Sequence, residues 1–306
     1  MKNLVILDFG TSKIKILVQK FNHLGDIETE FTFTNISIGK LLSKDQIITA
    51  EEKTKILEDF KEKIINIIVS FPKKDFEIRA IATEIFRKNK ELANILAQIT
   101  NEFGLSVEIL TPERECELLA ANFDLTNSDL LLDVGGGSVN TIYKLDNKLN
   151  SYCHSLGSYF LNNLFQSHGE IFSDTIYANM DQYIKKVLDS YAKIHKGKFN
   201  KIILGSNQML SFFNSLSEKS GINFMKDSSF SSDIIEDLIK TIFINKKYED
   251  LFQYFEKNPS FMYGADKMLV VLKNIVEFSG AKTISPTDNG ISLGLARICL
   301  NNIKMQ

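Results

Sequence analysis

The sequence predicts an α/β protein built from two similar domains, each with a mixed five-stranded sheet flanked by helices. Residues 4–18 and 130–145 share one pattern: an apolar strand that ends in Asp, a glycine-containing turn, and a second strand with alternating apolar positions. The two aspartates, Asp8 and Asp133, are much farther apart than the period of about 20 to 50 residues that marks a repeat array. A duplicated domain is therefore the better interpretation, with a cleft where the two copies face each other.

Length and composition set outer limits on the protein. The chain has 306 residues, of which 44% are hydrophobic and 24% charged, as in ordinary globular proteins with two domains. A net charge of −2 excludes an electrostatic footprint for duplex nucleic acid. No apolar run approaches the roughly 20 residues that cross a bilayer, so we expect no membrane association and a cytoplasmic location. A homodimer is compatible with the sequence, which does not fix the oligomeric state.

The first domain is expected at residues 1–122, completed by a C-terminal helix at 292–306, and the second at 123–306. After the first hairpin, residues 51–71 have apolar side chains at helical spacing. A strand begins at Phe76, a helix over 89–103 stops at Gly104, and a further strand covers 106–110. Thr111 and Pro112 then form an N-cap and first-turn pair. The resulting β-β-α-β-α-β-α order favours a mixed sheet.

The second half follows the same theme after its hairpin. Helices are expected at 171–192 and again up to about residue 256, separated by a strand at 201–206. A buried helix, a strand and a closing helix then follow, with the sequences FMYGADKMLVVLKNIVEFSG, AKTISP and GISLGLARICLNNI.

The first turn is a candidate phosphate loop. It reads Asp8-Phe9-Gly10-Thr11-Ser12-Lys13, in which glycine allows close backbone approach, and Thr11 and Ser12 add hydroxyl donors. A hairpin also needs glycine for geometric reasons, so the turn by itself indicates little. The Lys13 side chain either holds phosphate or is turned away by strand alternation.

The second turn carries the sharper signal. It reads Asp133-Val134-Gly135-Gly136-Gly137-Ser138, and three consecutive glycines are more than a plain hairpin needs. A close ligand explains them better. A carboxylate before such a loop commonly orients a hydrated divalent cation that shields phosphate oxygens. We therefore expect Mg²⁺ at Asp133 and, less directly, at Asp8.

Seven segments, in this order, resemble the exopolyphosphatase / guanosine pentaphosphate phosphohydrolase (Ppx/GppA) family. They are DFGTS, ATEIFR, ILTPERECELL, LLLDVGGGS, SLGS, FMYGADKMLVVL and ISPTDNGISLGLA. The resemblance implies the actin-like ATPase superfamily fold, with two ribonuclease H-like domains. It also implies release of a terminal phosphate from polyphosphate or from a guanosine alarmone such as pppGpp.

By the same resemblance, Glu115 would be the general base that activates water, and Arg87 would clamp phosphate. Without the family, Glu115 reads as an acidic side chain that complements a helix N-terminus, and Arg87 as a surface charge at a helix start. Several positions depart from the family pattern. Asn140 stands where the family has Glu, and Phe160 and Ser292 stand where it has arginine.

These departures keep three functions open. The leading hypothesis is a phosphohydrolase, in which both glycine turns bind phosphate. A phosphate or alarmone sensor with weakened turnover is the second, because Asn140 cannot offer a negative charge to Mg²⁺. An actin-like ATPase is the third, although residues 205–207 hold one glycine where an adenosine-binding Gly-Gly turn would be expected.

Overall fold

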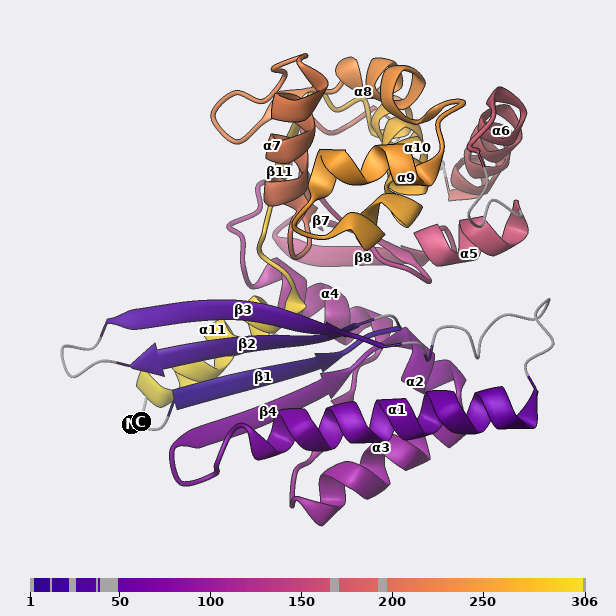
Figure 1. Ribbon diagram of the computed structural model, residues 1–306. Helices are drawn as coiled ribbons and strands as arrows, with labels where there is room; N and C mark the ends of the chain where they lie inside the picture. The colour runs from indigo at the N-terminus through magenta and orange to yellow at the C-terminus, as the bar shows by residue number, and fades with distance from the viewer. Residues whose placement is uncertain are drawn as a thin grey trace. The chain divides into compact units, whose positions relative to one another are not determined.

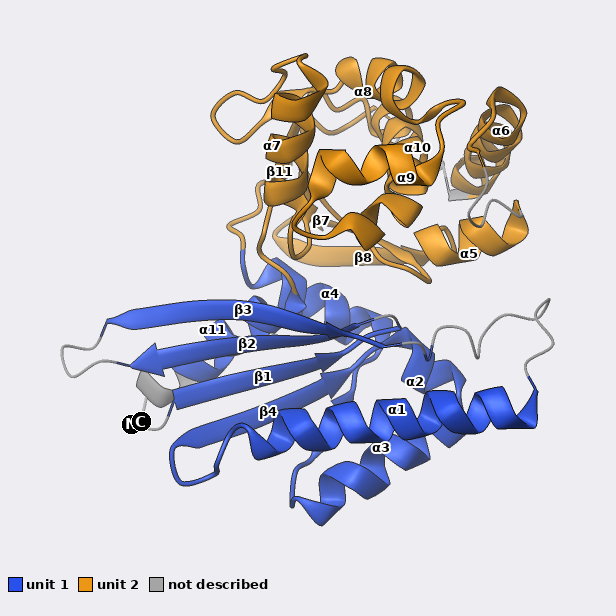
Figure 2. Ribbon diagram, viewed as in Figure 1, with its two compact units in different colours: residues 1–122, 291–306 blue, residues 123–290 orange. Residues whose placement is uncertain are grey.

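The chain forms two compact units, which Figure 2 colours separately. The computed structural model describes residues 3–11, 13–21, 26–36, 38, 49–165, 171–191 and 197–304. Unit 1 consists of residues 1–122 and 291–306, and unit 2 of residues 123–290. The chain therefore leaves unit 1, builds unit 2 and returns.

Unit 1 contains a five-stranded mixed sheet with helices on it (Figure 1). Its elements are β1 (Asn3–Phe9), β2 (Lys13–Phe21), β3 (Ile27–Asn35), α1 (Ala50–Val69), β4 (Phe76–Ala82), α2 (Glu84–Lys88), α3 (Lys90–Glu102), β5 (Val107–Ile109), α4 (Pro112–Ala120) and α11 (Ile291–Lys304). The strand order is β3-β2-β1-β4-β5. Strands β1, β2 and β3 are antiparallel, whereas β4 and β5 run parallel to β1.

Strand alternation divides the residues of β1 between two faces of this sheet. Val5, Leu7 and Phe9 join a core that includes Phe60 and Ile64 of α1. The even-numbered residues of β1, Asp8 among them, point to the other face. Helix α11 contacts both β1 and β2.

Local signals begin and end these helices, and those at Thr111, Pro112 and Gly104 were expected from the sequence. Thr49 and Glu52 form a capping box at the start of α1. The Thr111 side chain accepts a hydrogen bond from the Arg114 N–H, and Pro112 occupies the first turn of α4. Gly104 follows α3 with a φ of 58°, a conformation that glycine adopts without strain.

Unit 2 has a similar layout with one additional strand. Its elements are β6 (Asp129–Val134), β7 (Val139–Leu145), β8 (Lys148–His154), α5 (Ser158–Leu164), α6 (Asp174–Tyr191), β9 (Lys201–Gly205), α7 (Met209–Ser220), β10 (Phe230–Ser231), α8 (Ile234–Leu238), a π-helical turn (Ile239–Phe243), α9 (Tyr248–Leu251), 3-10 turns (Phe252–Phe255 and Pro259–Phe261), α10 (Met262–Ser279) and β11 (Thr283–Thr287). The strand order is β10-β11-β9-β6-β7-β8. The expected five strands are joined by the two-residue strand β10.

The core of unit 2 is centred on α10, which is largely buried, as predicted. Leu130, Leu132 and Val134 of β6 contribute their side chains to this core. Within the part of the chain that the structure describes, no helix is both long enough and apolar enough to cross a membrane.

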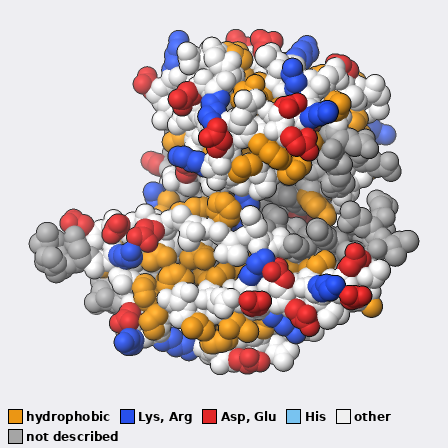
Figure 3. All heavy atoms as spheres, viewed as in Figure 1, with side chains coloured by type: hydrophobic (Ala, Val, Ile, Leu, Met, Phe, Trp, Pro, Cys, Tyr) orange, Lys and Arg blue, Asp and Glu red, His pale blue; other side chains and the backbone are white. Residues whose placement is uncertain are grey.

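Besides β10, two strands were not located from the sequence, and these two occupy matching places. β3 extends the first hairpin and β8 extends the second, so each unit begins with a three-stranded antiparallel meander. The β-β-α-β-α-β-α order is therefore corrected by one strand in the first unit. Most of β3 is exposed, and Ile27 and Phe31 are 41% and 38% accessible. Hydrophobic side chains are visible over this unit in Figure 3.

Candidate functional site

The two glycine turns have the same backbone geometry. The Gly10 N–H donates to the Lys13 carbonyl at 2.9 Å, and the Gly135 N–H donates to the Ser138 carbonyl at 2.9 Å. A side chain added at either glycine would place its Cβ 3.2 Å from that same carbonyl oxygen. A side chain at either glycine would therefore crowd the backbone of its own turn, in both units.

In unit 1, the aspartate before the turn is fully buried. Asp8 lies opposite Lys15 in the β1–β2 ladder, and its Oδ2 accepts from Lys15 Nζ at 3.1 Å. The Ser292 hydroxyl of α11 also donates to Oδ2, at 3.3 Å. Asp8 Oδ1 is buried and has no hydrogen-bond partner among the described residues. Lys15 already supplies a positive charge to Asp8, and a metal ion at this carboxylate stays a prediction.

In unit 2, the corresponding pair is different. Asp133 lies opposite Asn140 in the β6–β7 ladder, as Asp8 lies opposite Lys15. Asn140 is 3% exposed, and its side-chain oxygen is buried with no hydrogen-bond partner in the described part of the chain. A buried amide oxygen without a donor is costly, so this oxygen is suited to a ligand.

The triple-glycine turn is docked on the first residues of α5. The Gly135 carbonyl accepts from the Ser158 N–H at 3.0 Å, and the Gly136 carbonyl accepts from the Tyr159 N–H at 2.7 Å. Gly157, which caps α5, allows this approach. A Cβ at Gly157 would lie 2.3 Å from the Gly137 carbonyl carbon and 2.4 Å from the Gly136 oxygen.

This docking fixes the direction of two N–H groups. In a trans peptide the carbonyl and the following N–H point in opposite directions, and the described chain has no cis peptide bond. Because the Gly135 and Gly136 carbonyls point at α5, the N–H groups of Gly136 and Gly137 point away from it. Neither N–H donates to another described backbone group. Two successive N–H groups of this kind form an anion-binding concavity.

Arg87 and Glu115 meet at one edge of the unit 1 sheet. β4 and β5 are parallel neighbours, so α2 and α4, which follow them, begin at the same edge. The Arg87 guanidinium forms an ion pair with the Glu115 carboxylate and donates to the Leu110 carbonyl. The side chains of Arg87 and Glu115 are 19% and 7% exposed. Because β1 is parallel to β4, the Asp8 turn ends at this edge too.

The remaining predicted phosphate-binding residues belong to the two glycine turns. Thr11 follows Gly10 in the first turn and is partly buried, and Ser138 closes the second turn and is 8% exposed. Ser12 lies outside the described residues. Sequence reasoning missed Lys15 and the docking role of Gly157. Strand alternation could have found Lys15, because residues that face each other across a tight hairpin share one side of the sheet.

Two of the departures from the family pattern have structural roles here. Phe160 lies in α5 and packs against the unit 2 core. Ser292 is fully buried and contacts Asp8. Two positions that would carry arginine in the family therefore carry side chains that this chain uses for packing and for hydrogen bonding.

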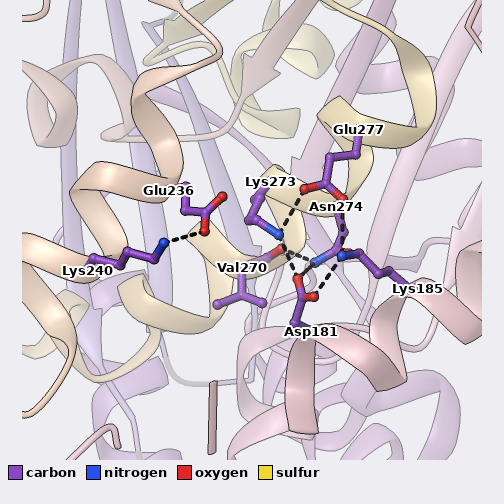
Figure 4. Close-up of polar contacts among 8 residues, drawn as sticks. All are labelled: Asp181, Lys185, Glu236, Lys240, Val270, Lys273, Asn274 and Glu277. Atoms are coloured by element: carbon purple, nitrogen blue, oxygen red, sulfur yellow. Dashed lines mark hydrogen bonds and ion pairs between the residues drawn. The ribbon is translucent and has the colours of Figure 1, made fainter. Parts of the chain in front are cut away.

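Unit 2 contains a polar cluster away from the glycine turn, where α6 meets α10 (Figure 4). Asp181 Oδ1 accepts from Lys273 Nζ and Asn274 Nδ2, both at 2.9 Å, and its Oδ2 pairs with Lys185 at 2.9 Å. Burial opposes ionisation of Asp181, but these hydrogen bonds outweigh it and lower its pKa. Lys273 also pairs with Glu277 at 2.9 Å. Because its charges pair with one another, we interpret this cluster as structural.

The backbone N–H groups at the start of α7 are bound by a side chain of the same unit. Asp288 Oδ1 accepts from the N–H groups of Leu210 and Ser211 at 2.8 and 3.3 Å. The Ser211 hydroxyl donates to Asp288 Oδ2 at 2.6 Å. A carboxylate thus satisfies this helix N-terminus, which follows the position of the expected adenosine turn.

Comparison with solved structures identifies the fold. A Ppx/GppA family member from Aquifex aeolicus has a TM-score of 0.70 at 16% identity, covering 99% of this chain and 98% of that one. An exopolyphosphatase from Cytophaga hutchinsonii has a TM-score of 0.74 at 16% identity, covering 98% of both chains. An exopolyphosphatase-like protein has a TM-score of 0.76 at 13% identity, covering 99% of both chains. At these identities the likeness establishes the fold.

The sequence comparison goes further. No curated protein matches the chain significantly. The family described as the Ppx/GppA phosphatase family matches residues 31–271, which is well over half of the chain. The expected resemblance is confirmed, and the chain belongs to the Ppx/GppA phosphatase family.

Proposed function

We propose that this protein is a phosphohydrolase that releases the terminal phosphate of inorganic polyphosphate or of a pppGpp-like guanosine alarmone. The observation that carries the proposal is the orientation of the Gly136 and Gly137 N–H groups, which α5 holds away from itself. Such preorganised donors stabilise phosphoryl oxygens without reorganisation during the reaction.

Glu115 is our choice for the general base, and Arg87 for the residue that controls it. In the ion pair the Glu115 carboxylate is neutralised by Arg87. A phosphate group that draws the guanidinium to itself would free the carboxylate to accept a proton from water. This exchange of partners links substrate binding to activation of the base.

Mg²⁺ fits the residues of the second turn. Within the described ranges no three His, Cys, Asp or Glu side chains gather to hold a metal. Mg²⁺ is commonly bound by one or two protein oxygens together with water and substrate phosphates. Asp133 and the Asn140 side-chain oxygen provide such a pair. When bound there, the ion would neutralise charge on the phosphate oxygens.

Release of phosphate from long-chain polyphosphate and, separately, from the guanosine alarmone tests the proposal. We expect release by the wild type with Mg²⁺ and a loss of about 10² to 10⁴-fold in Glu115→Gln. Glu113→Gln, in the same helix turn but exposed, is the matched control and should retain activity. Failure of the folded wild type to release phosphate from either substrate would refute the proposal.

The second candidate is a phosphate or alarmone sensor. Asn140 offers no negative charge to Mg²⁺, and Arg87 neutralises the Glu115 carboxylate, so both features favour binding without turnover. Tight binding of either ligand in calorimetry, without release of product, would support this alternative.

A further inference from the structure

Lys13 is a partly buried cation with no acidic partner among the described residues. It is the first residue of β2, directly after the unit 1 turn, and alternation places its side chain on the same face as Lys15. Its ammonium group lies 4.2 Å from the centre of the Phe33 ring. Within the described chain Lys13 forms no ion pair, and Asp8 on this face is already paired with Lys15.

This arrangement is unfavourable for the free protein. Burial, and to a lesser extent the charge of Lys15, lower the pKa of Lys13 to about 8. The Phe33 ring offers only a cation–π contact, which contributes about 0.5 to 1 kcal/mol at an exposed site. A positive charge therefore remains on β2, next to the Phe33 ring, without a counter-charge from the part of the chain that the structure describes.

The matching turn of unit 2 shows that the hairpin does not require a lysine. The residue that corresponds to Lys13 in the turn hydrogen bond is Ser138, and the residue that corresponds to Lys15 in the strand ladder is Asn140. The backbone hydrogen bond of the turn is 2.9 Å in both units. The two lysines are thus additions to a turn that forms equally well without them.

We propose that Lys13, beside Lys15, is an anion-binding residue that recognises a condensed phosphate, a ligand with negative charge on adjacent phosphate groups. The ligand supplies the counter-charge that the described residues do not provide. Lys13 therefore adds affinity for a chain of phosphates over a single orthophosphate. The inference rests on the proposed function and names the residue that selects its class of substrate.

Calorimetric titration with tripolyphosphate, orthophosphate and the guanosine alarmone tests this inference. Lys13→Met keeps the aliphatic stem and removes the charge, and we expect it to weaken tripolyphosphate binding about tenfold, or about 1.4 kcal/mol. Lys13→Arg, which restores the charge, should bind within about twofold of wild type. Lys55→Met removes an exposed lysine paired with Glu51 and is the matched control. Comparing the affinities for tripolyphosphate and for the alarmone tells whether Lys13 favours an inorganic polyphosphate or a guanosine alarmone.

Thermal unfolding of the free variants separates binding from a structural role. Loss of an unpaired buried charge should leave Lys13→Met at least as stable as wild type, whereas a structural lysine would make it less stable. Equal tripolyphosphate affinity in Lys13→Met and wild type would overturn this inference alone. If the wild type bound no condensed phosphate, the inference and the proposed function would both be refuted.

Discussion

Arg87 and Glu115 form an ion pair at the edge of the unit 1 sheet, although α2 and α4 place them far apart in the sequence. Both side chains are mostly buried, and Arg87 also donates to the Leu110 carbonyl. Family resemblance assigned these residues two separate roles. Under the proposed function their contact would couple the two roles, because the arginine that would bind phosphate also pairs with the carboxylate that would act as the base.

The ion pair predicts a measurable coupling free energy. Arg87→Met leaves the Glu115 carboxylate buried without the charge of Arg87, so we expect a loss of about 1 to 3 kcal/mol in the free energy of unfolding. Urea denaturation measures this loss. The double variant Arg87→Met/Glu115→Gln should lose less than the sum of the single variants. Arg79→Met breaks an exposed pair with Glu77 and should cost no more than about 1 kcal/mol. Strictly additive losses would contradict the coupling.

Gly157 predicts a specific loss of ligand binding. In Gly157→Ala the new Cβ collides with the backbone of Gly136 and Gly137 and forces α5 off the turn. We expect a stability loss of about 1 to 3 kcal/mol and loss of tripolyphosphate binding in calorimetry. Gly221→Ala is the control. It is strained by a φ of 74° in open space and should lose about 1 to 2 kcal/mol with unchanged affinity. Retained affinity in Gly157→Ala would show that docking on α5 does not orient the turn.

Asn140 predicts a change in the response to Mg²⁺. Asn140→Asp places a second carboxylate opposite Asp133, and the two charges repel when no cation is present. In the presence of a chelator we expect the variant to have a lower melting temperature than wild type. Added Mg²⁺ should raise the melting temperature of the variant more than that of wild type, because an ion that binds only the folded state stabilises it. Asn150→Asp, on β8, is the control and should respond to Mg²⁺ like wild type. A variant with no added Mg²⁺ response would place the metal elsewhere.

Lys13 predicts a pH dependence of stability with a definite sign. Its pKa is about 8 in the folded protein, below the ordinary 10.5. Between these values the unfolded chain binds more protons, so stability rises with pH through this window. The groups that face Lys13 are Lys15 on its own strand, Asp8 paired with Lys15 on β1, and the uncharged Phe33 and Asn35 on β3.

We therefore expect the free energy of unfolding of Lys13→Met to exceed that of wild type most below pH 8. The difference should shrink towards pH 10. Denaturant unfolding at several pH values measures the difference between the two proteins. A constant difference across this range would show that Lys13 titrates normally.

Much of the fold could be predicted from residue patterns, because the elements that form the cores have strong periodicity and clear end signals. Apolar spacing predicted a helix over residues 51–71, and the structure places α1 at Ala50–Val69. β3 escaped prediction for a physical reason. It is an edge strand with most side chains exposed, so it lacks the buried apolar positions that identify a strand.

The site could be predicted only in part. Glycines and aspartates mark the turns in the sequence, but the directions of the Gly136 and Gly137 N–H groups depend on α5, which packs against the turn through Gly157. The Arg87–Glu115 contact depends on the pairing of β4 with β5, which a single sequence does not specify. The structure therefore adds the orientation of the groups, while the sequence supplies their identity.

The place of helix α11 in the sequence constrains the order in which unit 1 can fold. Its Gly294 approaches the α4 backbone so closely that a Cβ there would lie 1.7 Å from the Leu118 carbonyl oxygen, and its Ser292 reaches Asp8. Residues 123–290, which form the whole of unit 2, leave the ribosome before this helix does. Strand β1 must therefore wait for α11, and the buried Asp8 acquires its contact with Ser292 only after unit 2 has been synthesised.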